Sequence, residues 1–260
     1  MMVRRIALVC AAAALVFGGC AKSAGKPYRV GLVNFVTGTV QITGHGGKVF
    51  DAKVGTPLDE GMKIRTVGKG ALCEVYIRDT ALKIFPDSEL DISRLGYAKD
   101  GTGEQTAMSL SEGKLFVRVA KKITKDDRFG VKTPLCVAAV RGTEFFVTKN
   151  EIACLDGKVE VRSVKSKNAA PVTIEDGEGA APTAKDVKKK DISKDAAKKL
   201  EADAKVKPVE AKNQALFDRL DKGDSSALKN LKARIREMSG GAEKKKDEEK
   251  PDIDLFFFKS

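Results

Sequence analysis

Cys20 has the surroundings of a lipid-attachment site. Arg4 and Arg5 precede an apolar stretch at residues 6–17, and two glycines lead from it to the cysteine. A basic start, an apolar middle and small residues before the cleavage point are the parts of a secretory signal peptide. A thiol that becomes the first residue after cleavage can carry a lipid on its sulfur. We therefore expect a signal peptide at residues 1–19 and a lipid on Cys20.

This order of residues is typical of bacterial lipoprotein signals and predicts where the chain is found. The apolar stretch is far shorter than the roughly 20 residues that cross a bilayer core, which argues against a permanent transmembrane anchor. An ordinary cleaved signal without a lipid is the remaining alternative. We expect a lipid-anchored protein of the bacterial cell envelope, periplasm-facing or surface-exposed, with residues 20–29 as the lipidated tether.

The other thiols indicate packing rather than chemistry. Cys10 leaves with the signal peptide, whereas Cys73, Cys136 and Cys154 each lie in an apolar, strand-like run. Buried cysteine behaves as a small hydrophobic residue, and this is the favoured interpretation. A disulfide between Cys136 and Cys154 is an alternative that the sequence leaves open, because it requires a short Cα separation. No CxxC motif or His–Cys pairing is present to bind zinc, so no metal is expected.

Arg141 stands in a short motif with Gly142, Thr143 and Glu144. Its guanidinium, set among small residues, could hold a carboxylate or a phosphate with two parallel hydrogen bonds. The favoured interpretation is structural: the arginine binds backbone carbonyls or Glu144 and stabilises a turn. The sequence leaves the choice between a binding role and a structural role open.

His45 is the single histidine, and it lies in a glycine-rich turn with no carboxylate or serine motif beside it. No nucleophile elbow, phosphate-binding loop or metal cluster occurs elsewhere. We therefore expect no enzyme activity, no catalytic residue and no cofactor.

Composition narrows the range of partners. The net charge is +12, and the positive residues are spread along the whole chain. Export speaks against nucleic acid as a partner, whereas a basic surface favours weak association with anionic lipids or cell-wall polymers. The absence of tryptophan and the presence of only three tyrosines argue against an aromatic-lined sugar cleft.

Residues 30–175 predict a mainly β domain. Apolar and polar residues alternate with period two, which is typical of strands with one face to a core and one to water. A turn glycine followed by such a strand recurs at Gly38, Gly113 and Gly157, and we interpret these as equivalent turn–strand units. The first choice is an antiparallel jelly-roll-like sandwich, and the alternative is a stacked β-roll. Examples of the alternation are Val40 and Ile42, Cys73 and Val75, and Val117 and Val119.

The sequence changes character after this domain. We expect a linker at residues 176–183 and a charged helical region at 184–241. A first helix spans 184–205, Pro208 begins a second, and Ser225 or Ser226 caps a third that ends at two glycines. Their apolar stripes are thin, so the helices are expected to dock loosely on the β domain or to extend from it.

Residues 242–260 are expected to form a disordered charged tail with an aromatic end. Three consecutive phenylalanines on a charged tether suggest a docking peptide for another envelope component or for the chain's own domain. A tail that packs locally is the alternative. The docking residues would be Leu255, Phe256, Phe257 and Phe258.

Read together, several segments of the β domain resemble the FecR domain family. They are residues 38–42, 55–66, 71–81, 86–92, 110–115 and 129–145. The most specific part runs from Thr133-Pro134 to Val140-Arg141-Gly142-Thr143-Glu144-Phe145. In this order the segments are similar to the family over residues 30–165.

Two departures from the family pattern lie at turns. Met62 stands where the family usually has aspartate, and Thr80-Ala81 replaces the usual glycine-serine pair. The best-known members are iron-siderophore regulators with a cytoplasmic sigma-factor-binding segment and a transmembrane helix, and here a lipoprotein signal stands in their place.

The resemblance therefore implies a non-enzymatic, lipid-anchored envelope protein whose β domain binds or scaffolds a protein partner of unknown identity. One alternative is a sensor component of envelope signalling that acts through a separate transmembrane regulator. The other alternative is a cell-wall-binding module.

Overall fold

The computed structural model describes residues 26–98, 100–119, 124, 126–165, 170–183 and 185–242. The mainly β class is confirmed, because one sixteen-stranded sheet is followed by helices. The strands are β1 (Gly31–Thr43), β2 (Val49–Asp51), β3 (Pro57–Leu58), β4 (Lys63–Ile77), β5 (Thr80–Ile84), β6 (Glu89–Tyr97), β7 (Glu104–Glu112), β8 (Lys114–Arg118), β9 (Arg128–Lys132), β10 (Cys136–Val140), β11 (Glu144–Thr148), β12 (Ile152–Asp156), β13 (Lys158–Ser163), β14 (Val172–Glu175), β15 (Glu178–Pro182) and β16 (Val187–Asp191). The helices are α1 (Lys194–Asp203), α2 (Ala211–Asp221) and α3 (Ser225–Met238). In the described ranges no helix has the length and apolar character needed to span a membrane.

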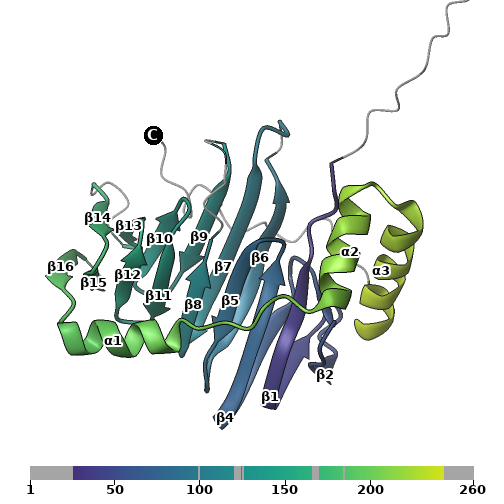
Figure 1. The fold of residues 1–260 in the computed structure, drawn as a ribbon, viewed down its shortest axis with the longest axis horizontal. Helices are drawn as coiled ribbons and strands as arrows, with labels where there is room; N and C mark the ends of the chain where they lie inside the picture. Colours follow the sequence, from purple (N-terminus) through teal and green to yellow (C-terminus); the bar gives the residue numbers. More distant parts are fainter. Residues whose placement is uncertain are drawn as a thin grey trace, which may run out of the picture.

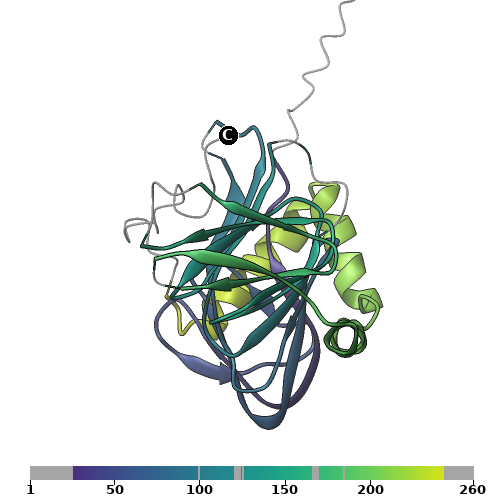
Figure 2. The ribbon, with the colours of Figure 1, turned by 90° about the vertical axis from the view of Figure 1, so that its left-hand side faces the viewer.

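The sheet folds over on itself into two layers (Figures 1 and 2). Layer one has the order β6-β7-β9-β10-β13-β14, and layer two has the order β5-β8-β11-β12-β15-β16. After β4 the chain passes alternately between the two layers, and each new strand or hairpin is added on the side of its layer that is further from β4. This progressive order is that of the stacked β-roll alternative. Among the strand pairs of the described residues, β7 with β9 is the parallel one, a difference from the antiparallel arrangement expected.

The long strand β4 joins the layers. Its first residues, 63–65, pair with β6, whereas residues 73–77 pair with β5. Strand β1 pairs with β4 on the other edge, with a register shift at Gly38. Gly38 has a φ of 65°, and a Cβ there would lie 2.7 Å from the Cα of Ala71. Gly38 therefore lies at a bulge inside β1 and not in the turn that was expected. Only glycine fits there, because β4 at Ala71 leaves no room for a side chain.

Single glycines mark places where the chain crosses between the layers. Gly113 lies between β7 and β8, and Gly157 lies between β12 and β13, each with a φ in the left-handed region. A Cβ on Gly113 would collide with Ser88, and one on Gly157 would lie 2.9 Å from the carbonyl oxygen of Gly142. The recurring glycine phrase in the sequence thus corresponds, at these two positions, to a crossing between layers.

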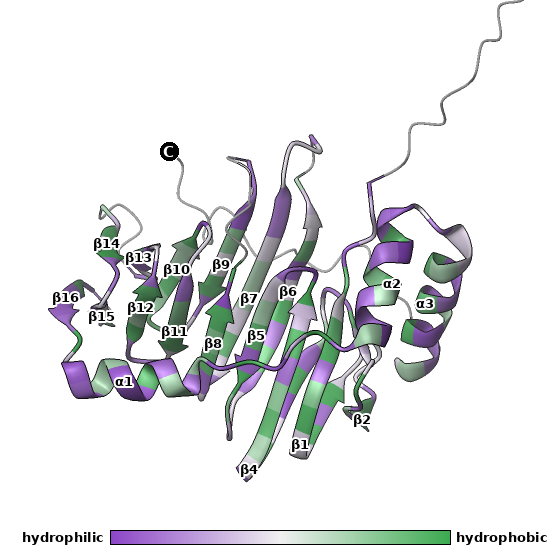
Figure 3. Ribbon diagram, in the orientation of Figure 1, coloured by the Kyte–Doolittle hydropathy of each residue, from purple (hydrophilic) through white to green (hydrophobic). Residues whose placement is uncertain are grey.

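The main core lies between the layers, and layer two is also buried on its outer face. Phe116 and Phe146 are almost fully buried there, with their ring centroids 4.8 Å apart. Leu200 and Ala204, from α1 and its end, pack against this aromatic cluster. The expectation that each strand keeps one face to water is therefore wrong for β8 and β11. In Figure 3 the strands carry bands of hydrophobic and hydrophilic residues, whereas β16 is mainly hydrophilic.

Residues 204–210, which we call the strap, connect α1 to α2 and run across β5, β4 and β1 (Figure 1). The N–H of Lys207 donates to Glu74 at 2.9 Å, and the hydroxyl of Tyr76 donates to the carbonyl oxygen of Lys207 at 2.8 Å. Asn34 donates to the carbonyl oxygen of Pro208 at 2.9 Å. Pro208 thus lies in the strap and does not begin α2, because its carbonyl is held by β1.

The boundary expected between the β domain and the helices is wrong. The segment taken as a linker contains β15, and the segment taken as the first helix contains β16, which pairs with β15 from Glu178 to Pro182. Helix α1 begins only at Lys194, after Ser193 has accepted a hydrogen bond from the N–H of Ala196. Lysine-rich sequence suits an exposed edge strand as well as a helix, because the charges discourage pairing with other chains.

The C-terminal helices dock on the β domain, one of the two arrangements expected. Phe217, Leu220, Leu231 and Ile235 join the main core. The cap of α3 is Asp224, whose carboxylate accepts two backbone N–H bonds, and not Ser225 or Ser226. The two glycines end α3 as expected, and both have a positive φ.

Candidate functional site

The motif at residues 141–144 forms the crossing from β10 to β11. Gly142 has a φ of 69°, which glycine adopts readily. Thr143 is 1% exposed, and its hydroxyl donates to the carbonyl oxygen of Lys158 at 2.8 Å. The hydroxyl oxygen of Thr143 also accepts a hydrogen bond from the N–H of Lys158 at 3.4 Å. Thr143 therefore joins this crossing to the neighbouring one at Gly157.

Arg141 is exposed, and among the described residues its guanidinium has no hydrogen bond or ion pair. Glu144, which the sequence suggested as its partner, instead binds the Nε of Arg118 on β8 at 2.7 Å. The favoured structural role of Arg141 therefore lacks the expected contact, because β8 brings a different arginine to Glu144. The exposed guanidinium is available for a carboxylate or phosphate outside the chain.

The described residues contain no cluster of three or more histidine, cysteine, aspartate or glutamate side chains suited to a metal ion. Cys73, Cys136 and Cys154 are unpaired and buried, so the favoured interpretation of these thiols is confirmed. Burial raises the pKa of Cys73 to about 12 and that of Cys136 to about 11. Burial, followed by nearby carboxylates, raises the pKa of Cys154 to about 12. These thiols are poor nucleophiles, because the thiolate is the reactive form.

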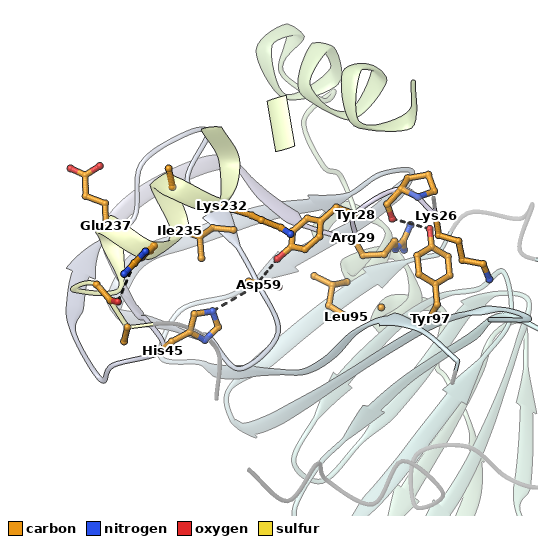
Figure 4. A pocket seen from close by; sticks show the side chains of 16 residues that line it. Lys26, Tyr28, Arg29, His45, Asp59, Leu95, Tyr97, Lys232, Ile235 and Glu237 are labelled. Carbon is orange, nitrogen blue, oxygen red and sulfur yellow. Dashed lines mark hydrogen bonds and ion pairs between the residues drawn. The ribbon is translucent and has the colours of Figure 1, made fainter. Parts of the chain in front are cut away.

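A pocket of about 940 Å³ lies where five separate stretches of the chain meet. We call it the α3 pocket, and Figure 4 shows its lining. The stretches are residues 26–29 before β1, the turns that hold His45 and Asp59, residues 95–97 at the end of β6, and α3 with residues 241 and 242. Its volume is within the range of small-ligand sites, about 300–1,000 Å³.

Three polar side chains in the lining of the α3 pocket are linked to one another. The hydroxyl of Tyr28 donates to Asp59 at 2.8 Å, and the Nε2 of His45 lies 3.6 Å from the same carboxylate oxygen. The backbone N–H of Glu60 donates to the other oxygen of Asp59 at 2.8 Å. Burial, together with Asp59, raises the pKa of Tyr28 far above its usual value, so the phenol stays protonated.

The sequence interpretation of His45 is wrong on one point, because a carboxylate does lie beside it. Asp59 is distant in sequence, and the β1–β2 hairpin and the turn after β3 bring the two side chains together. The backbone N–H of His45 also donates to Ser239 at 3.3 Å, which fixes the turn against the end of α3. No local spacing in the sequence signals these contacts.

The rest of the lining combines an apolar floor with a basic rim. Leu95 and Ile235 are each 5% exposed. The ammonium group of Lys26 lies 4.8 Å from the ring centroid of Tyr97, and that of Lys232 lies 5.2 Å from the ring of Tyr28. This combination is suited to a ligand that has an apolar body and negative charge.

Two further groups fix the pocket wall next to Tyr28. The side chain of Arg29 is 6% exposed and forms an ion pair with Glu104 at 2.8 Å. Burial raises the pKa of Glu104, while the charge of Arg29 acts in the opposite direction. The ion pair holds Arg29 in the structure, and its buried Nε has no hydrogen-bond partner among the described residues.

Two groups of expected site residues lie outside the described residues. They are the lipid-attachment residue Cys20 and the docking residues 255–258. The first and the last described residues, Lys26 and Ala242, both line the α3 pocket.

Comparison with known proteins identifies one family. Residues 63–160 match the family model described as FecR protein. Two crystal structures of a candidate anti-sigma factor from Parabacteroides distasonis resemble the chain, with TM-scores of 0.40 and 0.41 and identities of 20% and 19%. Each likeness covers 54% of this chain, and the chain spans 63% and 62% of the two proteins. No curated protein matches the chain.

The family match begins with β4 and ends within β13, so it includes the crossing at residues 141–144. The resemblance seen in the sequence is thus confirmed as a match to the FecR family model over residues 63–160.

Proposed function

We propose that this chain is a non-enzymatic, lipid-anchored protein of the bacterial cell envelope whose FecR domain binds a protein partner. The single observation that carries the proposal is the FecR match over residues 63–160. The signal-like sequence that ends at Cys20 supports export and anchoring.

The proposal gives Arg141 a role at the partner interface. Its guanidinium is exposed at a crossing that is otherwise held by Thr143 and by the ion pair of Glu144 with Arg118. A rigid turn that presents an arginine favours an acidic group on the partner, because guanidinium pairs with carboxylate in a planar, bidentate geometry.

Crosslinking with mass spectrometry in intact cells tests the partner. The expected result is a protein crosslinked to residues near the β10–β11 crossing. Arg141→Glu should reduce this crosslink by at least tenfold, since it replaces the attractive charge by a repulsive one. Lys149→Glu is the matched control, because Lys149 is an exposed cation in the turn at the other end of β11. Recovery of peptidoglycan alone would contradict the proposal and favour a cell-wall-binding module.

The anchor has its own test. Cys20→Ser removes the thiol that carries the lipid and leaves the β domain unaltered. The variant should leave the membrane fraction and become soluble or mislocalised. If it stays in the membrane fraction to the same extent as the parent, the lipid-anchor part of the proposal fails.

A sensor component of envelope signalling is the second candidate, and the FecR match favours it as well. In this case the crosslinked partner would be a separate transmembrane regulator. The identity of the crosslinked protein therefore separates the two candidates.

A further inference from the structure

We propose that the α3 pocket binds a carboxylate that carries an aliphatic chain, the chemical class of a medium-chain fatty acid. All of the pocket lining except residues 95–97 lies outside the FecR match. The inference is independent of the proposed partner binding, which involves the crossing at residues 141–144.

The apolar part of the lining is largely aliphatic. Leu95, at the end of β6, and Ile235, on α3, are each 5% exposed. Pro27 and Ala233 extend this surface within one concavity of about 940 Å³. A pocket of this size takes a small ligand, and an aliphatic chain that leaves water there gains affinity with every methylene group that it buries.

The buried acidic and guanidinium groups of the lining are already bound within the protein. Asp59 accepts a hydrogen bond from the hydroxyl of Tyr28 at 2.8 Å and another from a backbone N–H at 2.8 Å, and it lies 3.6 Å from the Nε2 of His45. Arg29 forms its ion pair with Glu104 at 2.8 Å. These contacts fix the pocket wall, so recognition of a ligand charge falls to the exposed groups of the rim.

Two lysines supply positive charge at the rim. Lys232 precedes Ile235 by three residues on α3, so both side chains lie on the same face of the helix, and Figure 4 shows Lys232 reaching toward Tyr28. The Tyr28 ring contacts the ammonium group of Lys232, and the Tyr97 ring contacts that of Lys26. Neither lysine forms an ion pair within the described residues. An ammonium group next to an apolar surface is suited to the head of a carboxylate whose chain enters the pocket.

The balance of charge favours a ligand with a single negative charge. Glu237 is exposed and also lines the pocket, so it opposes an acidic ligand and offsets one of the two lysines. Arg236 is the remaining cation of the lining, and its Nε donates to the carbonyl oxygen of Gly241 at 3.4 Å. A carboxylate therefore fits this rim better than the doubly charged phosphate of an alkyl phosphate.

Equilibrium dialysis with radiolabelled decanoate tests the proposal on the full chain that carries Cys20→Ser, so that no detergent competes for the pocket. One decanoate should bind per chain. Lys26→Glu together with Lys232→Glu should weaken binding at least tenfold, because two attractive charges become repulsive. Octanoate should bind roughly tenfold more weakly than decanoate, because it buries two methylene groups fewer. Decyltrimethylammonium, which has an aliphatic chain of the same length and a positive head, should also bind at least tenfold more weakly.

Lys229→Glu is the matched control, because Lys229 is exposed on α3 and lies outside the pocket lining. It should leave the affinity for decanoate unchanged. The proposal is overturned if decanoate does not bind, or if Lys229→Glu weakens binding as much as the two rim substitutions do. Equal affinity for decyltrimethylammonium would show apolar adsorption without recognition of charge, and tighter binding of decyl phosphate would contradict the choice of a carboxylate. None of these outcomes affects the Arg141 crosslink, so the two proposals fail separately.

Discussion

At the scale of single residues, threonine and not arginine holds the crossing at residues 141–144. Thr143→Val keeps the shape of the side chain and removes its bonds to Lys158. The net contribution of a hydrogen bond of this kind is about 0.5–1.5 kcal/mol. The free energy of unfolding, measured with urea, should fall by that amount.

Arg141→Ala provides the comparison. Arg141 is exposed and unpaired in the described chain, so its loss should change the free energy of unfolding by less than about 0.5 kcal/mol. A larger loss for Arg141→Ala than for Thr143→Val would contradict the assignment of structure to Thr143 and of recognition to Arg141.

The buried thiols lead to a prediction about reactivity. Cys73, Cys136 and Cys154 have pKa values of about 12, 11 and 12. At pH 8 the thiolate fraction of each is negligible, so none should be alkylated in the native chain, whereas all should react in denaturant. Peptide mass spectrometry after iodoacetamide treatment reads each site separately. Fast native labelling of Cys136 would show that β10 opens locally.

The contacts of His45 mark the limit of prediction at the residue scale. Its glycine-rich surroundings predicted a turn, and a turn is present between β1 and β2. Its neighbours Asp59 and Ser239 come from other turns, because hairpin register and the docking of α3 decide which side chains meet. Burial of the three thiols was predictable, since each lay in an apolar run.

At the scale of elements, the strap binds to the sheet through Glu74. Burial raises the pKa of Glu74, although the N–H of Lys207 and the charges of Lys83 and Lys207 act in the opposite direction. The folded state thus holds a proton above the unfolded pKa of about 4.3. Between the unfolded and folded pKa values the native state binds more protons, so this contribution to stability is lost as pH rises.

Glu74→Gln removes this titration and keeps an oxygen that can accept the N–H of Lys207. The variant should therefore gain stability relative to the parent as pH rises from 4 to 7, which paired thermal melts can measure. Glu160→Gln, at an exposed site on β13, should show no such trend. A Glu74→Gln variant that becomes relatively less stable over this range would contradict the raised pKa.

The alternation of apolar and polar residues predicted that strands are present, but it did not predict that α1 covers the outer face of layer two. Phe116 lies on the strand face opposite Val117, which the alternation predicted to face water, and α1 covers it. The apolar residues of α1 are sparse, so the sequence contains no strong apolar stripe that would have predicted its contact with layer two. The glycine before β8 was predictable as a turn, but a crossing between layers depends on which strands pair afterwards.

At the scale of the whole molecule, the family-matched segment is not a complete folding unit. Strand β1, outside the match, pairs with β4 from Leu32 opposite Tyr76 to Thr43 opposite Lys63. Strands β14 and β15, also outside it, pair with β13 and β12. The strap and α2 then bind β1 and β4, so the segments on both sides of the match close the same body.

Residues 63–160 expressed alone should therefore fail to fold cooperatively. Without β1, the long strand β4 has an open edge, and buried side chains such as Val75 and Ile64 lose their cover. Residues 26–242 should instead show one sharp unfolding transition, because all their layers share the core. Urea denaturation followed by circular dichroism compares the two chains. If the 63–160 chain unfolds cooperatively, at a urea midpoint near that of the 26–242 chain, this prediction is wrong. The flanking strands and helices would then be additions to a domain that folds without them.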